Sequence, residues 1–146
     1  MSYATIEAAA VLVIQKHADF DTTNCLAGDN KPIGSGLARV CRVLYGGYRK
    51  APITLQVEKF TWTINLDVYV AYRGSKTTLE AALATERQKV IDKLGLYPLL
   101  DSATGVVRAE ITNGDKPEPL GQKNAAYRGQ RLYLEVDEYV TPAREE

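Results

Sequence analysis

The residues that could carry chemistry gather after the first predicted helix. His17 is the only histidine in the chain, and Asp19, Asp21 and Cys25 follow it closely. Imidazole, carboxylate and thiolate all bind transition metals, so this group could form a mixed metal site. We favour the interpretation that His17 is solvated or faces the dipole at a helix C-terminus. Because there is no second histidine and no G-x-S-x-G elbow, His17 is the single candidate base for triad-type catalysis.

The other chemical motifs are incomplete. Gly34 and Gly36 form a G-x-G, but they precede a predicted strand and lack the rest of a nucleotide fingerprint. Cys25 and Cys41 are too few and too far apart for a zinc pattern, and a reducing compartment disfavours a disulfide, so we expect two ordinary buried or half-buried thiols. No spacing selects a catalytic pair among the carboxylates of predicted strands, which are Glu58, Asp67, Glu110, Glu135 and Asp137. We therefore expect no enzyme, no metal site and no cofactor.

Composition narrows the class of partner. The 146 residues include 18 Lys plus Arg and 18 Asp plus Glu, so no net field attracts nucleic acid or an anionic membrane. A local basic and aromatic cluster could still touch phosphates; it comprises Arg39, Arg42, Tyr45, Tyr48, Arg49 and Lys50. No basic region precedes the short apolar stretch at residues 8–14, which predicts neither a secretory signal nor a membrane span. We expect one soluble domain over residues 1–146, made in a cytoplasm, with residues 140–146 as a flexible tail.

The most informative pattern is the alternation over residues 60–72, where every even-numbered residue from Phe60 to Tyr72 is large and apolar. Side chains of a strand alternate between faces, so this pattern predicts one very long, half-buried strand. At roughly 3.3 Å per residue it reaches about 40 Å, which matches or exceeds the diameter of a domain of this size. We expect the strand to overhang and a neighbouring subunit to cover its apolar face.

The remaining elements complete an α-β-β-α-β-β order. The sequence predicts a helix from the N-terminus to about residue 17, a loop at 19–36 and a strand at 37–45 that ends at Gly46 and Gly47. The apolar phase changes near Glu58 and Lys59, which predicts a bulge or bend there. Further expected elements are an extended segment at 54–57, a helix at 79–94 with a left-handed stop at Gly95, strands at 106–112 and 130–140, and a loop at 113–129. The predicted fold is α+β: an antiparallel or mixed β-sheet with a very long strand, covered by two helices.

Several of these segments together resemble a known family. They are the N-terminal helix, the strand ending in Val-Leu-Tyr-Gly-Gly at residues 43–47, the strand opening at Phe-Thr-Trp at residues 60–62, and the helix at 79–94. The chain resembles the tail terminator, or tail completion, proteins of tailed bacteriophages, particularly those of Mu-like phages. The likeness covers residues 3–140, but the loop at 19–36 does not align.

The resemblance implies a structural virion protein located in the tail or neck and assembled in the host bacterial cytoplasm. Such proteins form a homohexameric ring that caps the tail tube, stops its polymerisation and joins the tail to the head connector, while phage DNA passes through without specific contacts. Two alternatives remain open. The chain could be another neck component, such as a head-closure or connector protein, or a non-viral cytoplasmic binding domain.

Three segments are candidate contact sites, because loops and overhanging strand ends often carry partners. They are the loop at 45–50, the end of the long strand at 69–73 and the proline-bearing loop at 113–129. The candidate interface residues are Tyr45, Gly46, Gly47, Tyr48, Arg49, Tyr69, Tyr72, Arg73, Lys116, Pro117, Pro119, Tyr127 and Arg128.

Overall fold

Three long stretches rich in β-branched and aromatic residues pair with one another and form the centre of the protein. The computed structural model describes residues 3–22, 24–28, 39–71, 76–103, 105–122 and 125–141. In chain order the elements are α1 (Tyr3–Gln15), β1 (Cys25–Ala27), β2 (Arg39–Pro52), β3 (Glu58–Ala71), α2 (Lys76–Gly95), β4 (Val106–Gly114), β5 (Glu118–Gln122) and β6 (Ala125–Val140).

The strands form a single mixed sheet. Its order is β1-β2-β3-β6-β4, and β5 pairs with the beginning of β6. The β1–β2 pair is parallel, whereas the other pairs are antiparallel. The prediction of an α+β fold with a mixed sheet and two helices is therefore confirmed.

The predicted element order was wrong, because two short strands lie inside segments expected to be loops. β1 falls within residues 19–36, and its three residues are too few to show alternation. β5 falls within residues 113–129 and contains Pro119 and Gly121, both of which disfavour strands. In both cases a longer neighbouring strand supplies the pairing that the local sequence does not predict.

The predicted boundaries around the first hairpin also need correction. β2 does not end at Gly46 and Gly47 but continues to Pro52, and residues 53–57 form the turn into β3 and not an extended segment. The apolar phase changes near Glu58 because of this turn, whereas the bulge lies in β2, between Tyr45 and Tyr48. The alternating strand spans Glu58–Ala71, and it is not exceptional here, since β2 is as long and β6 is longer.

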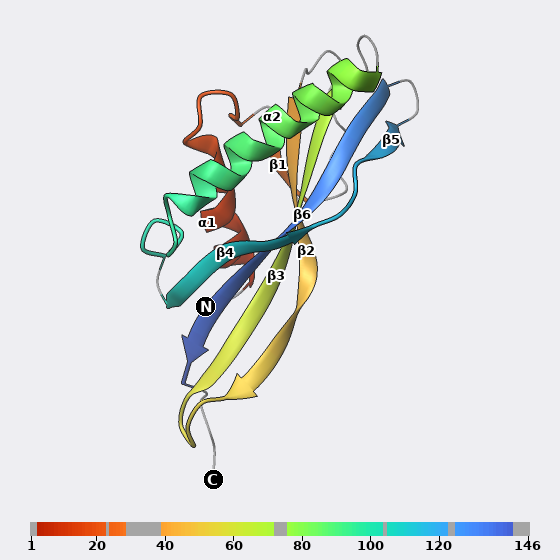
Figure 1. The fold of residues 1–146 in the computed structure, drawn as a ribbon. Helices are drawn as coiled ribbons and strands as arrows, with labels where there is room; N and C mark the ends of the chain where they lie inside the picture. Colours follow the sequence, from red (N-terminus) through yellow and green to blue (C-terminus); the bar gives the residue numbers. More distant parts are fainter. Residues whose placement is uncertain are drawn as a thin grey trace.

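Both helices pack on one face of the sheet (Figure 1). α1 contacts β1 and β2, while α2 contacts β3, β4, β6 and α1. The apolar side chains of β3 that meet the helices are Ile64, Leu66, Val68 and Val70. The helices contribute Ile6, Ala10, Val13, Ile14, Leu79, Leu83, Val90 and Leu94 to the same core.

The opposite face of the sheet carries no described helix. Val40, Tyr69 and Tyr127 form a small second cluster there. The end of the sheet that carries the β2–β3 turn extends beyond both helices (Figure 1). Part of the helix-side face is therefore left without a helical cover at this end.

The left-handed backbone after α2 lies elsewhere than predicted. Gly95 belongs to the helix and does not have a positive φ, whereas Leu100, Asp101 and Ser102 have φ angles of 49°, 58° and 61°. Leu100 is buried in the core, and the carbonyl of Pro98 accepts a hydrogen bond of 2.7 Å from the N–H of Ala109 in β4. Packing of this loop on β4 accounts for a conformation that non-glycine residues rarely adopt.

Gly46 gives a direct test of the hairpin geometry. A Cβ at position 46 would lie 2.9 Å from the carbonyl oxygen of Thr63 and 2.5 Å from Oδ1 of Asn65. Side-chain motion cannot relieve the contact with the Thr63 backbone, so we expect Gly46→Ala to lower the free energy of unfolding by about 1–3 kcal/mol. Urea denaturation followed by circular dichroism measures this loss.

Gly95→Ala is the matched control, because a Cβ there has no atom within 4 Å. Alanine favours the helix over glycine, so we expect this variant to match or exceed the wild-type stability by up to about 1 kcal/mol. Equal stability of the Gly46→Ala variant and the wild type would show that β2 and β3 do not approach each other closely at this bulge.

Candidate interaction site

The uncovered end of the β2–β3 hairpin presents a strip of aromatic side chains on the helix side of the sheet. Register places Tyr45 opposite Ile64, Tyr48 opposite Trp62, and Lys50 opposite Phe60. Tyr45 is 52% exposed and Tyr48 is 57% exposed, which is unusual for side chains so close to a hydrophobic core. We call Tyr45, Tyr48, Phe60 and Trp62 the aromatic strip.

The rings of the aromatic strip contact one another. The Phe60 and Trp62 rings are stacked, with centroids 5.6 Å apart, and Tyr48 lies 5.2 Å from Trp62 and 5.8 Å from Phe60. Tyr3 of α1 joins from the covered side, 4.5 Å from Tyr45 and 5.8 Å from Trp62. Because each ring limits the motion of the next, the exposed tyrosines are held in place before any partner binds.

The bulge at Gly46 and Gly47 is what aligns this strip. Residues three apart in a regular strand point to opposite faces, so Tyr45 and Tyr48 would separate without an extra residue between them. The register shift inserts that residue, and Gly47 adopts a φ of 102°, which favours glycine. The glycine pair thus puts both tyrosines on the same face.

Polar contacts fix the inner edge of the strip. The indole Nε1 of Trp62 donates a hydrogen bond of 3.3 Å to Oε1 of Glu138, a carboxylate that is only 1% exposed. Burial, followed by the nearby Glu7 side chain, raises the pKa of the Tyr3 phenol well above its ordinary value, so this hydroxyl stays neutral. The Trp62–Glu138 hydrogen bond thus joins β3 to β6, and the Tyr3 ring packs on Trp62 from α1.

The turn at the end of the hairpin adds more exposed apolar surface. Ile53 is 47% exposed and Leu55 is 92% exposed. The hydroxyl oxygen of Thr54 accepts hydrogen bonds from the backbone N–H groups of Gln56 and Val57, at 3.1 and 3.0 Å. The turn therefore has an ordered backbone that presents Leu55 to solvent.

The other predicted contact residues lie away from the aromatic strip. Tyr69 and Tyr127 are buried on the opposite face, with ring centroids 6.3 Å apart. Arg128 forms an ion pair with Glu80 of α2, and its guanidinium also donates a hydrogen bond of 3.4 Å to the carbonyl of Pro117. These three residues therefore make contacts within the chain, and the structure does not bring them together with Tyr45 and Tyr48.

The remaining candidate interface residues lie at or near the surface or outside the described residues. Arg49 lies on the helix-free face, where its guanidinium approaches Glu135 at 3.5 Å. Lys116 is exposed and Pro117 is half-buried. Tyr72 and Arg73 lie outside the described residues, as does the side chain of Pro119. Sequence analysis placed the overhanging end of the long strand at residues 69–73 and so left Phe60 and Trp62 out of the candidate contacts, whereas the end that extends beyond the helices is the one at the β2–β3 turn (Figure 1).

A charged network spans the helix-free face. Arg108 on β4 donates from Nε to Asp137 at 2.7 Å, from Nη2 to Glu135 at 3.2 Å and from Nη1 to Glu110 at 2.7 Å. The hydroxyl of Thr61 donates to Asp137 at 2.7 Å, which connects the network to β3. Positive and negative groups are interleaved here, so this face has no surplus of positive charge to attract phosphate.

A second ion pair on the same face holds β3 to β6. Arg131 donates from Nε and Nη2 to the two oxygens of Asp67, at 2.8 and 3.0 Å. Asp67 is buried, and this fork geometry satisfies both of its oxygens. The hydrogen bond to Asp67 raises the pKa of the Arg131 guanidinium above its ordinary value, so the guanidinium stays protonated.

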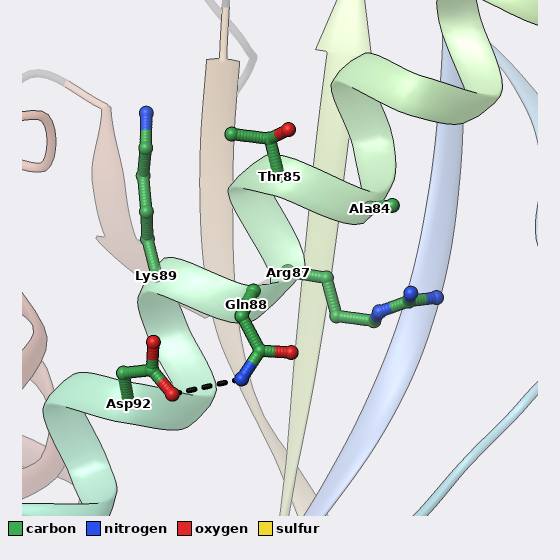
Figure 2. A pocket seen from close by; sticks show the side chains of 6 residues that line it. All are labelled: Ala84, Thr85, Arg87, Gln88, Lys89 and Asp92. Atoms are coloured by element: carbon green, nitrogen blue, oxygen red, sulfur yellow. Dashed lines mark hydrogen bonds between the residues drawn. The ribbon is translucent and has the colours of Figure 1, made fainter.

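A shallow hollow on α2 does not gather groups around a ligand position. Figure 2 shows that Arg87 and Lys89 extend to opposite sides of the helix, while Gln88 donates to Asp92 at 2.7 Å. Arg87 Nη1 donates to Gln130 at 2.7 Å, and Lys89 Nζ lies 2.7 Å from Asp19 and 3.0 Å from Glu86. Both cations are therefore already engaged in contacts that hold α2 to the rest of the fold.

The side chains around His17 also make contacts that stabilise the fold. His17 Nδ1 accepts a hydrogen bond of 3.1 Å from the backbone N–H of Asp19, whereas the Asp19 carboxylate pairs with Lys89. Among the described residues, no set of three or more His, Cys, Asp or Glu side chains could hold a metal ion. Neither helix, over its described residues, is long and apolar enough to cross a membrane.

Comparisons with known proteins leave the family open. The chain matches no protein-family model and no curated protein. One solved structure is similar over 100% of this chain and 99% of the other, with 12% sequence identity and a TM-score of 0.46. A likeness at this level carries no argument about fold or function.

Asp137 allows the charged network to be tested. Burial disfavours its charged form, but hydrogen bonds from Arg108 and Thr61 outweigh this effect and lower the pKa of the Asp137 carboxyl. We expect Asp137→Asn to lower the free energy of unfolding at pH 7 by about 1–3 kcal/mol. A group with a lowered folded-state pKa stabilises the protein above its unfolded-state pKa, so the difference shrinks as the pH falls below about 4.

Urea denaturation at pH 7 and pH 3 measures this difference. Glu110→Gln is the matched control, because Glu110 also accepts from Arg108 at 2.7 Å but its side chain is 60% exposed. We expect this control to lose less than about 1 kcal/mol. A pH-independent loss in Asp137→Asn would contradict the role of the ionised carboxylate.

Proposed function

We propose that this chain is a structural subunit that assembles with copies of itself and with another protein, as a tail terminator of a tailed bacteriophage. The observation that carries the assembly role is the aromatic strip, which continues from the edge of α1 toward the end of the sheet that extends beyond both helices (Figure 1). The terminator assignment itself rests on the family resemblance of the sequence. The proposal includes a hexameric ring, a tail-tube partner, a head-connector partner and DNA that passes through the ring.

The chemistry of the aromatic strip suits a protein partner. Tyrosine and tryptophan are enriched at the centres of protein interfaces, because they offer a large apolar area with few rotatable bonds. The strip and the turn together expose Tyr45, Tyr48, Ile53 and Leu55 at this end of the hairpin. A soluble chain gains free energy by covering such a patch with a partner.

The sheet edges supply a second argument for assembly. β1 pairs with β2 only as far as Val43, and no described strand pairs with that side of β2 over residues 44–52. At the other edge, no described strand pairs with the outer side of β4. An unpaired edge is a template for another chain.

The outer edges of β2 beyond Val43 and of β4, which have no described partner strand, differ from each other and so favour a head-to-tail contact between copies. Pairing the β2 edge of one copy with the β4 edge of the next would bury both edges, and the contact would repeat around an axis. Such a contact gives a closed ring when its rotation is right and a filament when it is not. A ring that docks on a tube but offers no copy of the tube's own docking surface ends polymerisation.

Electron microscopy of negatively stained protein, alone and with the presumed tail-tube protein, tests this proposal. We expect rings, or tubes of fixed length capped at one end. Binding to a portal-side protein without any effect on tube growth would instead indicate another neck component. Monomers under all conditions, with unchanged tube growth, would contradict assembly and favour a cytoplasmic binding domain.

Tyr48 and Leu55 test the aromatic strip as the contact surface. We expect Tyr48→Ser and Leu55→Ser each to raise the protein concentration needed for assembly by about tenfold or more, because each removes an exposed apolar contact. Leu55 is almost fully exposed, so its variant should also keep the wild-type melting temperature. Sedimentation velocity over a concentration series measures the change.

Tyr139→Ser is the matched control. Tyr139 is 49% exposed and pairs with Lys59, so it lies near the same end of the sheet but on the helix-free face. We expect this variant to assemble like the wild type. If all three variants assemble normally, the hairpin is not the interface, although a ring formed through other surfaces would remain possible and would be visible in the micrographs.

A further inference from the structure

Two buried cysteines lie opposite each other in neighbouring strands. Cys25 of β1 is the register partner of Cys41 of β2, and both are free thiols. Cys25 is 2% exposed and Cys41 is fully buried, and both belong to the main hydrophobic core. The sequence separation of these cysteines gave no indication of this proximity.

The spacing of paired strands suits a bond between these residues. Neighbouring strands lie about 4.7–4.9 Å apart, whereas the Cα atoms of disulfide-bonded cysteines lie about 4.4–6.8 Å apart. Side chains of register partners in paired strands lie on the same face of the sheet, so the two thiols are neighbours in the core. The neighbouring Cys25 thiol, followed by burial, raises the pKa of the Cys41 thiol.

We infer that Cys25 and Cys41 are a modification site, at which a small-molecule disulfide oxidises the two thiols to an intramolecular disulfide. The Cys25 thiolate attacks one sulfur of the small disulfide, forms a mixed disulfide and releases one small thiol. Cys41 Sγ then attacks Cys25 Sγ and releases the second small thiol. The protein loses two electrons and two protons, and the small disulfide gains both.

The position of β1 explains how a buried pair could react. β1 has three residues and lies at the edge of the sheet, and among the described strands it pairs only with β2. Short edge elements open more readily than central strands. We therefore expect oxidation to follow local opening of β1, so that its rate rises in mild denaturant while the rest of the sheet remains folded.

The bond would have a defined structural effect. It would link β1 covalently to β2. The link would lie close to Val43, the last residue of β2 that pairs with β1. It would also close a loop over residues 26–40 and so restrict the unfolded chain. This inference does not depend on ring formation and applies equally to a monomer.

Treatment of the reduced protein with oxidised glutathione, with and without urea below the unfolding transition, tests the inference. We expect both thiols to disappear together, the intact mass to fall by two hydrogen atoms, and peptide mapping to find Cys25 joined to Cys41. The oxidised protein should melt at a higher temperature than the reduced protein, and a reducing agent should reverse the change.

Cys25→Ala and Cys41→Ala are the matched controls. Each keeps one thiol, so oxidation should stop at the glutathione adduct in either variant. Glutathione adducts on both cysteines of the wild-type protein, or disulfide-linked dimers alone, would overturn the inference. Survival of both thiols in urea that opens β1, as judged by hydrogen exchange, would also overturn it.

Discussion

The rest of the structure depends on the pairing of β3 along its whole length with strands on both sides. β3 is antiparallel to β2 and to β6, and its register with β6 runs without a shift from Glu58 to Ala71. This pairing leaves the apolar side of β3 in position for the two helices. A slip of one residue would turn that side to solvent, so the register and the core fix each other.

A single bulge then gives the two halves of β2 different roles. Before Gly46, β2 contributes Cys41 and Val43 to the core, and β1 pairs with its outer edge. After Gly47, β2 has passed beyond the helices, and the extra residue keeps Tyr48 on the same face as Tyr45. The aromatic strip is therefore a continuation of the core surface onto a part of the sheet that nothing described covers. A continuous apolar surface of this kind is consistent with a contact between proteins.

The charged side chains mainly stabilise the fold. Arg131 with Asp67 and Arg108 with Asp137 hold neighbouring strands together on the helix-free face, and Lys89 with Asp19 joins α2 to the segment after α1. His17 and the hollow on α2 belong to this same set of internal contacts. Among the described residues, the features that suit recognition are an apolar strip and two sheet edges, which explains why assembly is the function we propose.

The sequence by itself determined the fold class, the two helices and the core face of β3, because alternation and helical spacing follow from local backbone geometry. It also placed Tyr45 and Tyr48 among the candidate contacts. Only the tertiary structure decided that β1 and β5 are strands, that Phe60 and Trp62 lie beneath exposed tyrosines, that Tyr69 and Tyr127 are buried, and that Cys25 meets Cys41. These outcomes depend on which distant segments pair and on where the helices end over the sheet, and a local pattern carries neither kind of information.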